Sequence, residues 1–315
     1  MKISVIIATY NGAKFIEEQF DSILAQSVQP DEVIITDDGS KDNTREIVQQ
    51  YIDDHGLNAV WHLLINERNK GYAKNFLDGA MNTTGDIIFF CDQDDIWTND
   101  RIKKMSDVMD SNPSINLLCS NLEPFYYEED TRKWSKKDLK VMKTDGSIEI
   151  CELTPAYFHL KRSGCTMCIR KKFLEEIMPY WTANWPHDDF VWKMAVISSS
   201  CAIRHFISMK RRMHSNNATV IRVRTREGRV KQLHEYKQHY LSLIKYAENC
   251  KLSEEKSKII YHNMNSVEVR LKVIKKRHLW EWILLYLKYK DCYPRKKGLY
   301  FDLYIAIFNK YEGVN

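Results

Sequence analysis

The segment DIIFFCDQDD, residues 86–95, is the stretch that decides the fold. It joins a continuous apolar run to three carboxylates, Asp92, Asp94 and Asp95. A short apolar run with no polar alternation is typical of a strand covered on both faces, as in a parallel sheet. The segment therefore predicts a buried strand over 86–91 that carries acidic side chains at its carboxyl end.

The preceding residues repeat this pattern. Apolar runs at 3–8, 32–36 and 60–65 read as further strands, and Asn11-Gly12 and Pro30-Asp31 mark breaks between elements. Amphipathic stretches between and after the runs predict helices over 13–26, 42–51, 71–81 and 99–109. This β-α order predicts an α/β fold with a doubly wound, mostly parallel sheet. Residues 112–215 are less regular, with a charged stretch at 128–143, and 225–290 read as helical.

The composition is that of a globular protein. The chain has 315 residues, 44% of them hydrophobic, and a formal net charge of +5 that is too small to imply nucleic acid. No segment reaches the ~18 apolar residues that a membrane helix needs, so we expect a cytoplasmic protein. Eight scattered cysteines favour reduced, buried thiols over a disulfide framework. The pair Cys165 and Cys168 has metal or redox spacing but no second pair to complete it.

The acidic end of the 86–91 strand predicts a cation site. Clustered carboxylates repel one another unless a cation compensates them, and Asp92 and Asp94 are spaced to share one divalent ion. Hard oxygen ligands favour Mg²⁺ or Mn²⁺, with substrate phosphates completing the shell. The alternative is a polar turn or helix cap.

A second polar loop, Asp37-Asp38-Gly39-Ser40, follows the 32–36 strand. Its carboxylates are suited to accept hydrogen bonds from a nucleoside, although the motif taken alone favours an Asx turn before the next helix. Both loops follow the carboxyl ends of strands, where open α/β sheets bind ligands. Because no Gly-x-Gly-x-x-Gly follows the first strand, a classical dinucleotide fold is disfavoured.

Two later clusters add candidate chemistry. The cluster Trp185-Pro186-His187-Asp188-Asp189 offers a general base beside an imidazole. Alternatively, Asp188 or Asp189 caps a helix over the apolar run 190–197, and one acid could cap the helix while the other acts as the base. The segment 211–217, Arg-Arg-Met-His-Ser-Asn-Asn, offers cations for a diphosphate and His214 as a metal ligand. The alternative for His214 is an exposed histidine with no role.

These motifs, in this order, resemble family 2 glycosyltransferases, which have the GT-A fold. The resemblance over residues 1–110 rests on Ala8-Thr9-Tyr10-Asn11-Gly12, Asp37-Asp38-Gly39-Ser40, Asn69-x-Gly71 with Asn75, and Asp92-Gln93-Asp94-Asp95. It continues to about residue 220, where Ser163-Gly164-Cys165-Thr166-Met167, His187-Asp188 and His214-x-Asn216-Asn217 resemble the rhamnosyltransferase-type branch of bacterial surface-polysaccharide synthesis. That branch usually has an aromatic residue after His-Asp, where this chain has Asp189.

The resemblance implies a role for each matching residue. Asp188 would be the catalytic base, with Asp189 as a candidate second acid. The metal ligands would be Asp94, Asp92 and His214. Acceptor-side residues would be Trp97, Gly164, Cys165 and His187. Donor-binding residues would be Thr9, Tyr10, Asn11, Asp37, Asp38, Gly71, Lys74, Asp92 and Gln93.

The implied activity is that of an inverting, metal-dependent hexosyltransferase. The donor would be a dTDP- or UDP-sugar, with rhamnose as the first candidate. The acceptor would be a hydroxyl of a growing glycan linked to undecaprenyl diphosphate, in the synthesis of lipopolysaccharide O-antigen, capsule or cell-wall polysaccharide. Residues 1–220 would form the GT-A catalytic domain, with 1–110 on the nucleotide-sugar side and 111–220 on the acceptor side. Residues 221–315 would form a helical C-terminal region.

The C-terminal region carries a basic and aromatic segment. Over 275–297, cations bracket the apolar run Leu279-Trp280-Glu281-Trp282-Ile283-Leu284-Leu285-Tyr286-Leu287. Such a segment suits an interfacial helix on an anionic bilayer, so we expect peripheral attachment to the inner face of the plasma membrane, and a chain ending near Arg270 that stays folded. Packing on the catalytic domain and a homodimer contact are the alternatives.

Two other functions are consistent with part of the pattern. A nucleotidyltransferase would open with a glycine-rich, basic loop, which Thr9-Tyr10-Asn11-Gly12 is not. A non-catalytic nucleotide-sugar-binding module of a synthase complex would lack the base or the acidic motif, and both are present. A nucleic-acid-binding role would need a basic patch outside the tail.

Overall fold

The computed structural model describes residues 1–126, 143–155, 157–214, 223, 225–295 and 297–308. The charged stretch near 128–143 and the pair Asn216-Asn217 therefore lie almost wholly outside the described residues. The chain forms two compact units. The sheet unit comprises Met1–Glu152, Leu160–Pro179 and Pro186–Asn217, and the helical unit comprises Leu153–His159, Tyr180–Trp185 and Ala218–Asn315.

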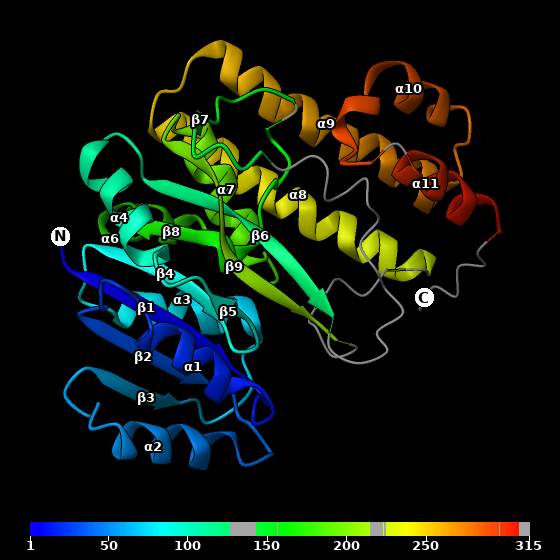
Figure 1. Ribbon diagram of the computed structural model, residues 1–315. Helices are drawn as coiled ribbons and strands as arrows, with labels where there is room; N and C mark the ends of the chain where they lie inside the picture. The colour runs from blue at the N-terminus through cyan, green and yellow to red at the C-terminus, as the bar shows by residue number, and fades with distance from the viewer. Residues whose placement is uncertain (127–142, 156, 215–222, 224, 296, 309–315) are drawn as a thin grey trace. The chain divides into compact units, whose positions relative to one another are not determined.

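The first ninety residues build the parallel half of the sheet. Strands β1 (Ile3–Thr9), β2 (Glu32–Asp37), β3 (Trp61–Ile65) and β4 (Ile87–Asp92) lie in the order β3-β2-β1-β4, and all three pairings are parallel (Figure 1). The register pairs Thr9 with Asp37 and Ala8 with Asp92. The polar residues that follow these strands consequently meet at one edge, as the sequence predicts.

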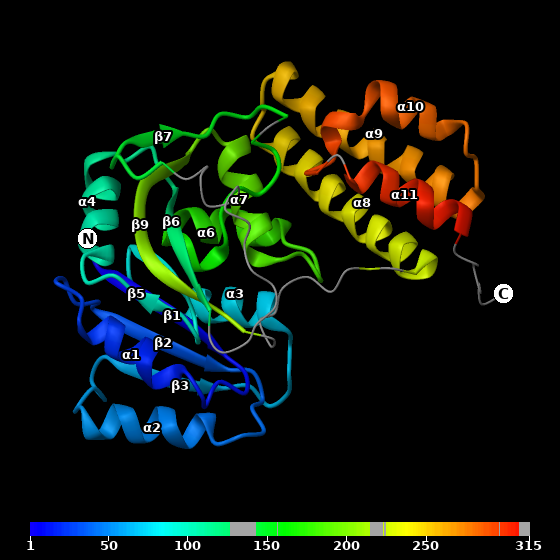
Figure 2. The same cartoon turned by 45° about the vertical axis from the view of Figure 1, so that its right-hand side comes forward.

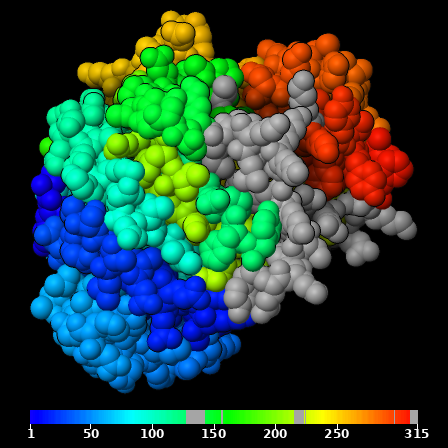
Figure 3. All heavy atoms as spheres, in the orientation of Figure 1, coloured from blue at the N-terminus to red at the C-terminus, as the bar shows by residue number. Residues whose placement is uncertain are grey.

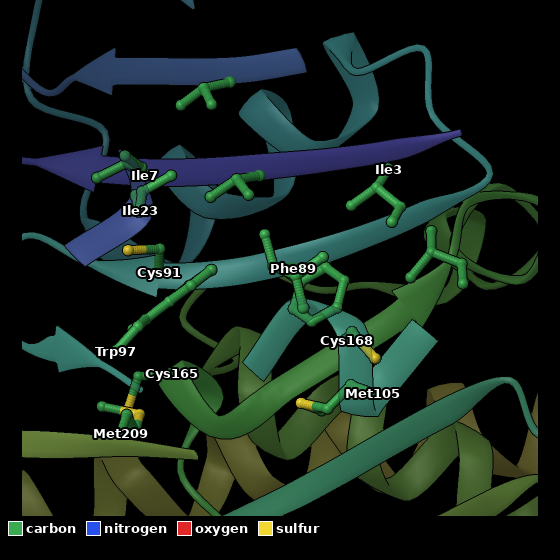
Figure 4. Close-up of a cluster of buried hydrophobic side chains, with 14 of the residues drawn as sticks. Ile3, Ile7, Ile23, Phe89, Cys91, Trp97, Met105, Cys165, Cys168 and Met209 are labelled. Carbon is green, nitrogen blue, oxygen red and sulfur yellow. The ribbon is translucent and has the colours of Figure 1, made fainter. Parts of the chain in front are cut away.

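Helices cover both faces of this half, which explains its continuous apolar strands. The buried side chains of α1 (Ile16–Leu24), α2 (Thr44–Asp54) and α4 (Arg101–Ser111) share one core cluster with alternate residues of β1, β2 and β4 (Figure 4). In the space-filling view, the residues of α1 and α2 (blue) form a continuous surface over this side (Figure 3). Helix α3 (Tyr72–Asn82) packs on the other face, where a Cβ at Gly79 would meet Ile6 Cδ1 at 2.3 Å.

The second half of the sheet is mixed. Strand β8 (Met167–Arg170) runs antiparallel to both β4 and β6 (Leu117–Tyr126), whereas β6 runs parallel to β9 (Cys201–Met213). The short strands β5 (Ile96–Trp97) and β7 (Ile148–Ile150) pair antiparallel with β9, which bends along its length (Figure 2). Helices α6 (Lys171–Ile177) and α7 (His187–Ile197) and the 3₁₀ turns η1 (Gly164–Thr166) and η2 (Met178–Tyr180) complete this part. The predicted α/β class is confirmed, and the parallel pairing is concentrated in β1 to β4.

The helical unit contains α8 (Arg226–Asn249), α9 (Glu254–Lys276), α10 (Glu281–Lys288), the 3₁₀ turn η3 (Lys290–Cys292) and α11 (Lys297–Phe308). Thr225 and Ser253 cap α8 and α9 by accepting hydrogen bonds from the backbone N–H groups of Gly228 and Lys256. Residues from all four helices form its core. In the described part of the chain, none of the helices has the length and apolar character to span a bilayer.

The helical unit also buries a charged network. Asp302 is fully buried and accepts hydrogen bonds from Arg229 Nε at 2.8 Å, Arg270 Nε at 2.7 Å and the Tyr293 hydroxyl at 2.8 Å. Burial opposes ionisation of Asp302, but the two guanidinium groups outweigh it and hold the pKa of this carboxyl below its usual value. The network ties α11 to α8 and α9.

All eight cysteines are free thiols, and seven of them are buried, Cys250 being exposed. The expectation of buried, reduced thiols is therefore confirmed for all but Cys250.

Candidate active site

The first part of the site is a hydrogen-bonded carboxylate at the end of β2. Asp37 accepts bonds from the Thr9 hydroxyl at 3.1 Å, the Ser40 N–H at 2.9 Å and Arg45 Nε at 2.7 Å, and from the Ser40 hydroxyl. Burial raises the pKa of Asp37, but these donors more than offset it, so the pKa lies below its usual value. Asp37 is thus an ionised side chain that fixes the loop between β2 and α2.

The neighbouring carboxylate, Asp38, holds the loop before α3. One oxygen accepts bonds from the Lys70 N–H at 2.8 Å and the Asn66 amide at 3.1 Å, and the other accepts the Gly71 N–H at 2.9 Å. Gly71 has φ +83°, a conformation that favours glycine. Lys74, one turn into α3, forms an ion pair with Asp78 at 2.7 Å. Asp38 therefore fixes the predicted donor residue Gly71 at the end of β2, and Lys74 is held by Asp78 instead.

The turn after β1 is joined to the acidic segment after β4. The Gln93 side chain accepts the Tyr10 N–H at 2.9 Å and donates to the Tyr10 carbonyl at 3.1 Å. A Cβ at Gly12 would lie 2.2 Å from Gln93 Oε1, so this approach requires glycine. Asn11, at φ +49°, receives the Lys41 N–H on its side-chain oxygen at 2.8 Å. Tyr10 remains 43% exposed and free to contact a ligand.

The acidic segment itself gathers three carboxylates. Burial and the charge of Asp94 raise the pKa of Asp92 to about 6. Burial and the charges of Asp94 and Asp92 also raise the pKa of Asp95. Asp94 Oδ2 lies 2.7 Å from His214 Nε2, a residue just past the end of β9. Although Asp95 is buried, its Oδ2 has no hydrogen-bond partner among the described residues. Asp92 and Asp95 lie close enough to share a cation with the Cys165 sulfur, whereas Asp94 is paired with His214.

The two arginines at the end of β9 have different surroundings. Burial alone would lower the pKa of Arg211, but Cys165 and the carboxylates of Asp92 and Asp95 raise it, so its charge compensates the acidic cluster. Arg212 instead packs its guanidinium over the rings of Phe15 at 4.5 Å and Phe125 at 4.7 Å. It also donates to the Asp94 carbonyl at 3.0 Å. Arg211 is thus the cation beside the carboxylates, and Arg212 supports the backbone that carries them.

A fourth carboxylate, Asp188, approaches this cluster from the first turn of α7. Burial and the charge of Asp189 raise the pKa of Asp188 to about 6, and Asp92 adds to this shift, whereas the Gly164 N–H opposes it. A Cβ at Gly164 would lie 3.2 Å from Asp188 Cβ and 2.4 Å from His187 Nε2. The 3₁₀ turn η1 therefore packs directly against the start of α7.

The neighbours of Asp188 differ in charge and burial. His187 is buried against Phe76, with ring centroids 4.3 Å apart, and burial lowers its pKa to about 3. Neither ring nitrogen of His187 has a hydrogen-bond partner among the described residues. Asp189 forms an ion pair with Lys193 one turn later in α7. Asp189 thus has a cationic partner, whereas Asp188 faces the carboxylate of Asp92.

Two predicted acceptor-side residues lie in the core. Trp97 is 2% exposed and Cys165 is 1% exposed, and both belong to the cluster shown in Figure 4. The Arg101 guanidinium lies 4.1 Å from the Trp97 ring and donates to the Cys165 carbonyl at 2.6 Å. This burial argues against direct contact of either side chain with an acceptor. Cys165 still lies close enough to Asp92 and Asp95 for the three to share a cation.

Sequence reasoning assigned no role to Tyr72 or Arg45. Tyr72 is 48% exposed, and burial together with the charges of Asp188, Asp189 and Asp92 raises its pKa to about 12. Its position directly after Gly71 was the available signal. Arg45 completes the hydrogen bonding of Asp37, but an arginine in an amphipathic helix gives no signal of its own.

Comparison with known proteins identifies the family. A family model described as glycosyl transferase family 2 matches residues 4–178, which include the parallel strands, the acidic segment and η1. The chain belongs to this family.

Relatives in this family include one named as a rhamnosyl transferase and one named for teichuronic acid biosynthesis. The dTDP-rhamnosyl transferase RfbG of Shigella flexneri is 30% identical over 223 residues, covering 67% of this chain and 72% of its own length. The putative teichuronic acid biosynthesis glycosyltransferase TuaG of Bacillus subtilis is 37% identical over 107 residues, covering 34% and 41%. The chain spans 56–65% of the length of three uncharacterized glycosyltransferases that it matches, from Nostoc and two Rickettsia species.

Solved structures share the fold. TarS 1-349 of S. aureus, in complex with UDP-GlcNAc, superposes with a TM-score of 0.63 at 18% identity and covers 95% of this chain and 84% of its own. The mannosyltransferase PcManGT of Pyrobaculum calidifontis, in complex with GDP-Man and Mn²⁺, gives a TM-score of 0.54 at 16% identity and covers 98% and 87%. The predicted GT-A fold is confirmed.

Proposed function

We propose that this chain is an inverting glycosyltransferase that moves a sugar from a nucleoside diphosphate to a glycan hydroxyl. One observation carries the proposal: Asp188, with a pKa raised to about 6, lies close enough to the acidic segment for the charge of Asp92 to affect it. A base beside a diphosphate-binding segment is what a single displacement at an anomeric carbon requires.

The donor would lie across the carboxyl ends of β1, β2 and β4. Tyr10 and the Asp37 and Asp38 loops would contact the nucleoside, and Arg211 would contact the diphosphate, which the exposure of Tyr10 and the charge of Arg211 support. Asp94 and His214, with Asp92, would hold Mg²⁺ or Mn²⁺, supported by the 2.7 Å approach of Asp94 to His214. When bound, the cation would neutralise charge that develops on the leaving diphosphate.

The reaction would proceed in one step. Asp188 accepts the proton of the acceptor hydroxyl while the hydroxyl oxygen forms a bond to the anomeric carbon. The bond from that carbon to the phosphate oxygen breaks, and its electron pair leaves with the nucleoside diphosphate. Because attack comes from the face opposite the leaving group, the configuration inverts. The raised pKa of Asp188 suits a base that works near neutral pH.

The donor we favour is a dTDP-sugar, since RfbG is named a dTDP-rhamnosyl transferase and is 30% identical over two thirds of this chain. A UDP-sugar is the alternative, as UDP-GlcNAc is the ligand in the TarS complex.

We propose that residues 1–110 contact the donor, that 111–220 contact the acceptor, and that the helical C-terminal region, from 221, has a separate role.

That separate role would be attachment to an anionic membrane, where a polyprenyl-diphosphate-linked acceptor would lie. In α10 and its N-cap, Trp280 is 68% exposed and Leu287 70%, and in α11 Phe308 is 68% exposed. Lys275, Lys276 and Arg277 precede α10, and Lys288 ends it. Exposed apolar side chains bracketed by cations support this surface over a purely solvated one.

A thermal unfolding experiment tests the donor site. Nucleotide sugars are added one by one, with and without Mn²⁺ or Mg²⁺, to the wild type and to Asp94→Ala. Because a ligand that binds only the folded state raises the unfolding midpoint, we expect one nucleotide class to raise it, with a smaller rise in the variant. No rise with any donor, in a folded protein, would contradict the proposal.

A further inference from the structure

A second set of metal-ligating side chains lies in the helical unit, apart from the acidic segment. His262 comes from α9, and Asp291 and Cys292 come from η3. One ligand atom of each lies within 4.8 Å of the other two. The proposed glycosyl transfer uses none of these residues.

The distances fit a tetrahedral ion. His262 Nε2 lies 3.2 Å from Asp291 Oδ1, and Cys292 Sγ lies 3.9 Å from the same oxygen. Zinc bonds of about 2.0–2.3 Å to nitrogen, oxygen and sulfur place ligand atoms roughly 3.3–3.7 Å apart, so small side-chain shifts would bring the set into place. We propose that His262, Asp291 and Cys292 form a zinc site that joins α9 to η3.

The surroundings favour a preformed site. The Tyr289 ring packs against the His262 imidazole with centroids 4.9 Å apart, which limits rotation of the imidazole. Cys292 is 5% exposed, whereas the side chains of His262 and Asp291 are 29% and 42% exposed. The sulfur is therefore shielded from solvent, and the other two ligands leave a path for the ion.

The described residues supply three ligand atoms, and His159 contacts the main chain of the same turn. His159 Nε2 lies 3.3 Å from the main-chain oxygen of Asp291, so a second imidazole borders the same turn. Water can occupy the fourth position. The mixed nitrogen, oxygen and sulfur donors favour zinc over magnesium, which prefers oxygen ligands.

The thiol of Cys292 would bind the ion as a thiolate. Its proton would pass to solvent as the sulfur–zinc bond forms.

Cobalt tests the site, since Co²⁺ replaces Zn²⁺ and a cobalt–thiolate bond gives a charge-transfer band in the near ultraviolet. The full-length chain is treated with a chelator and then titrated with Co²⁺. We expect the band to appear with one ion per chain, to vanish on addition of Zn²⁺, and to be absent from Cys292→Ser. His262→Ala and Asp291→Asn should each weaken Co²⁺ binding at least tenfold.

Two cysteine variants act as controls. Cys250 belongs to the same unit but is exposed and outside the cluster, and Cys165 borders the acidic segment of the sheet unit. Cys250→Ser and Cys165→Ser should both keep the band, and Zn²⁺ should raise their unfolding midpoints as in the wild type. A band that survives in Cys292→Ser, or no band at all, would overturn the zinc site and leave a His262–Asp291 ion pair beside a buried thiol. Neither outcome bears on the donor site.

Discussion

At the scale of single residues, Asp188 is the side chain whose removal should separate catalysis from binding. Asn at position 188 keeps the shape but cannot accept a proton, so Asp188→Asn should lower kcat by about 10²–10⁴-fold, the range of general-base catalysis. Donor binding should change little. Steady-state and donor-binding measurements check this, and an equal loss of donor affinity would show that Asp188 acts mainly in binding.

The same variant has a predictable effect on stability. Because the pKa of Asp188 rises to about 6 in the folded chain, from a usual value of 3.8, its ionisation opposes folding. The protonated Asp188 therefore contributes to the free energy of unfolding. This contribution is fully present below the unfolded pKa and is lost as pH rises through about 6. Asp188→Asn should therefore raise the unfolding midpoint more at pH 8 than at pH 4.

Wild-type activity should also fall as pH drops below about 6.

Asp189 offers a contrasting residue one position along. Its carboxylate pairs with Lys193, whose side chain is only 9% exposed. Asp189→Asn should destabilise the fold by about 1–3 kcal/mol, since a largely buried ammonium loses its charged partner. Denaturant unfolding measures the loss, and the double variant with Lys193→Met should recover part of it. If Asp189→Asn instead abolished turnover without loss of stability, Asp189 would be the better candidate for the base.

The sequence predicted the site residues unevenly. Motifs after strand ends predicted that Asp38 and Asp94 lie at one edge, because parallel strands bring their carboxyl ends together. Asp188, in the first turn of α7, was predicted from its own motif and from the family resemblance. The approach of His214 to Asp94 spans 120 positions, and no local pattern pairs the two, although His214 was a candidate metal ligand. The burial of Trp97 and Cys165 could not be predicted from the motifs around them. It depends on a contact between distant elements, in which Arg101 packs against Trp97 in β5 and bonds to Cys165 in η1.

At the scale of elements, the contact between η1 and α7 should be sensitive to one methyl group. In Gly164→Ala the new Cβ would lie 2.4 Å from His187 Nε2, so the start of α7 must shift. Overpacking of this kind costs about 1–3 kcal/mol, and the shift should also lower kcat by moving Asp188. Unfolding and kinetic measurements on the same preparation test both effects.

A double-mutant cycle identifies the cause. If the His187 ring is what the new methyl group meets, Gly164→Ala should cost less stability in a His187→Ala background than in the wild type. Equal costs in both backgrounds would rule out this contact as the source.

The elements themselves were predictable where local pattern decides them. Strands β1 to β4 and helices α1 to α4 lie within a few residues of the expected ranges, since apolar runs and turn residues mark them. The pairing of β8 between β4 and β6 was not foreseen, because antiparallel insertion leaves the same apolar pattern as parallel pairing. The 13 residues of β9 likewise alternate too weakly to mark a strand.

At the scale of the whole molecule, the division into units could be anticipated only in outline. The helical unit begins near the expected residue 221 but also takes Leu153–His159 and Tyr180–Trp185, which no local signal marks. A chain ending near Arg270 would remove Asp302, the buried partner of Arg270, and the core residues Leu285, Leu299 and Ile305. Such a truncation should unfold the unit, contrary to the sequence-based expectation, so membrane attachment must be tested by substitution.

Attachment to a membrane should depend on the exposed apolar side chains of α10 and its N-cap. Trp280 and Leu287 lie outside the core of the helical unit, at 68% and 70% exposure, so replacing both with serine should leave the unfolding midpoint nearly unchanged. It should sharply reduce cosedimentation with vesicles that contain anionic lipid, since their apolar area would no longer enter the interface. Leu241→Ser on α8, where the wild-type residue is 41% exposed, is the matched control and should bind vesicles normally.

Binding by the wild type should weaken with added salt and on zwitterionic vesicles, because the lysines near α10 supply the electrostatic part of the attraction. If the double variant bound vesicles as well as the wild type, or if it changed only the oligomeric state, the surface would instead be a contact between protein chains.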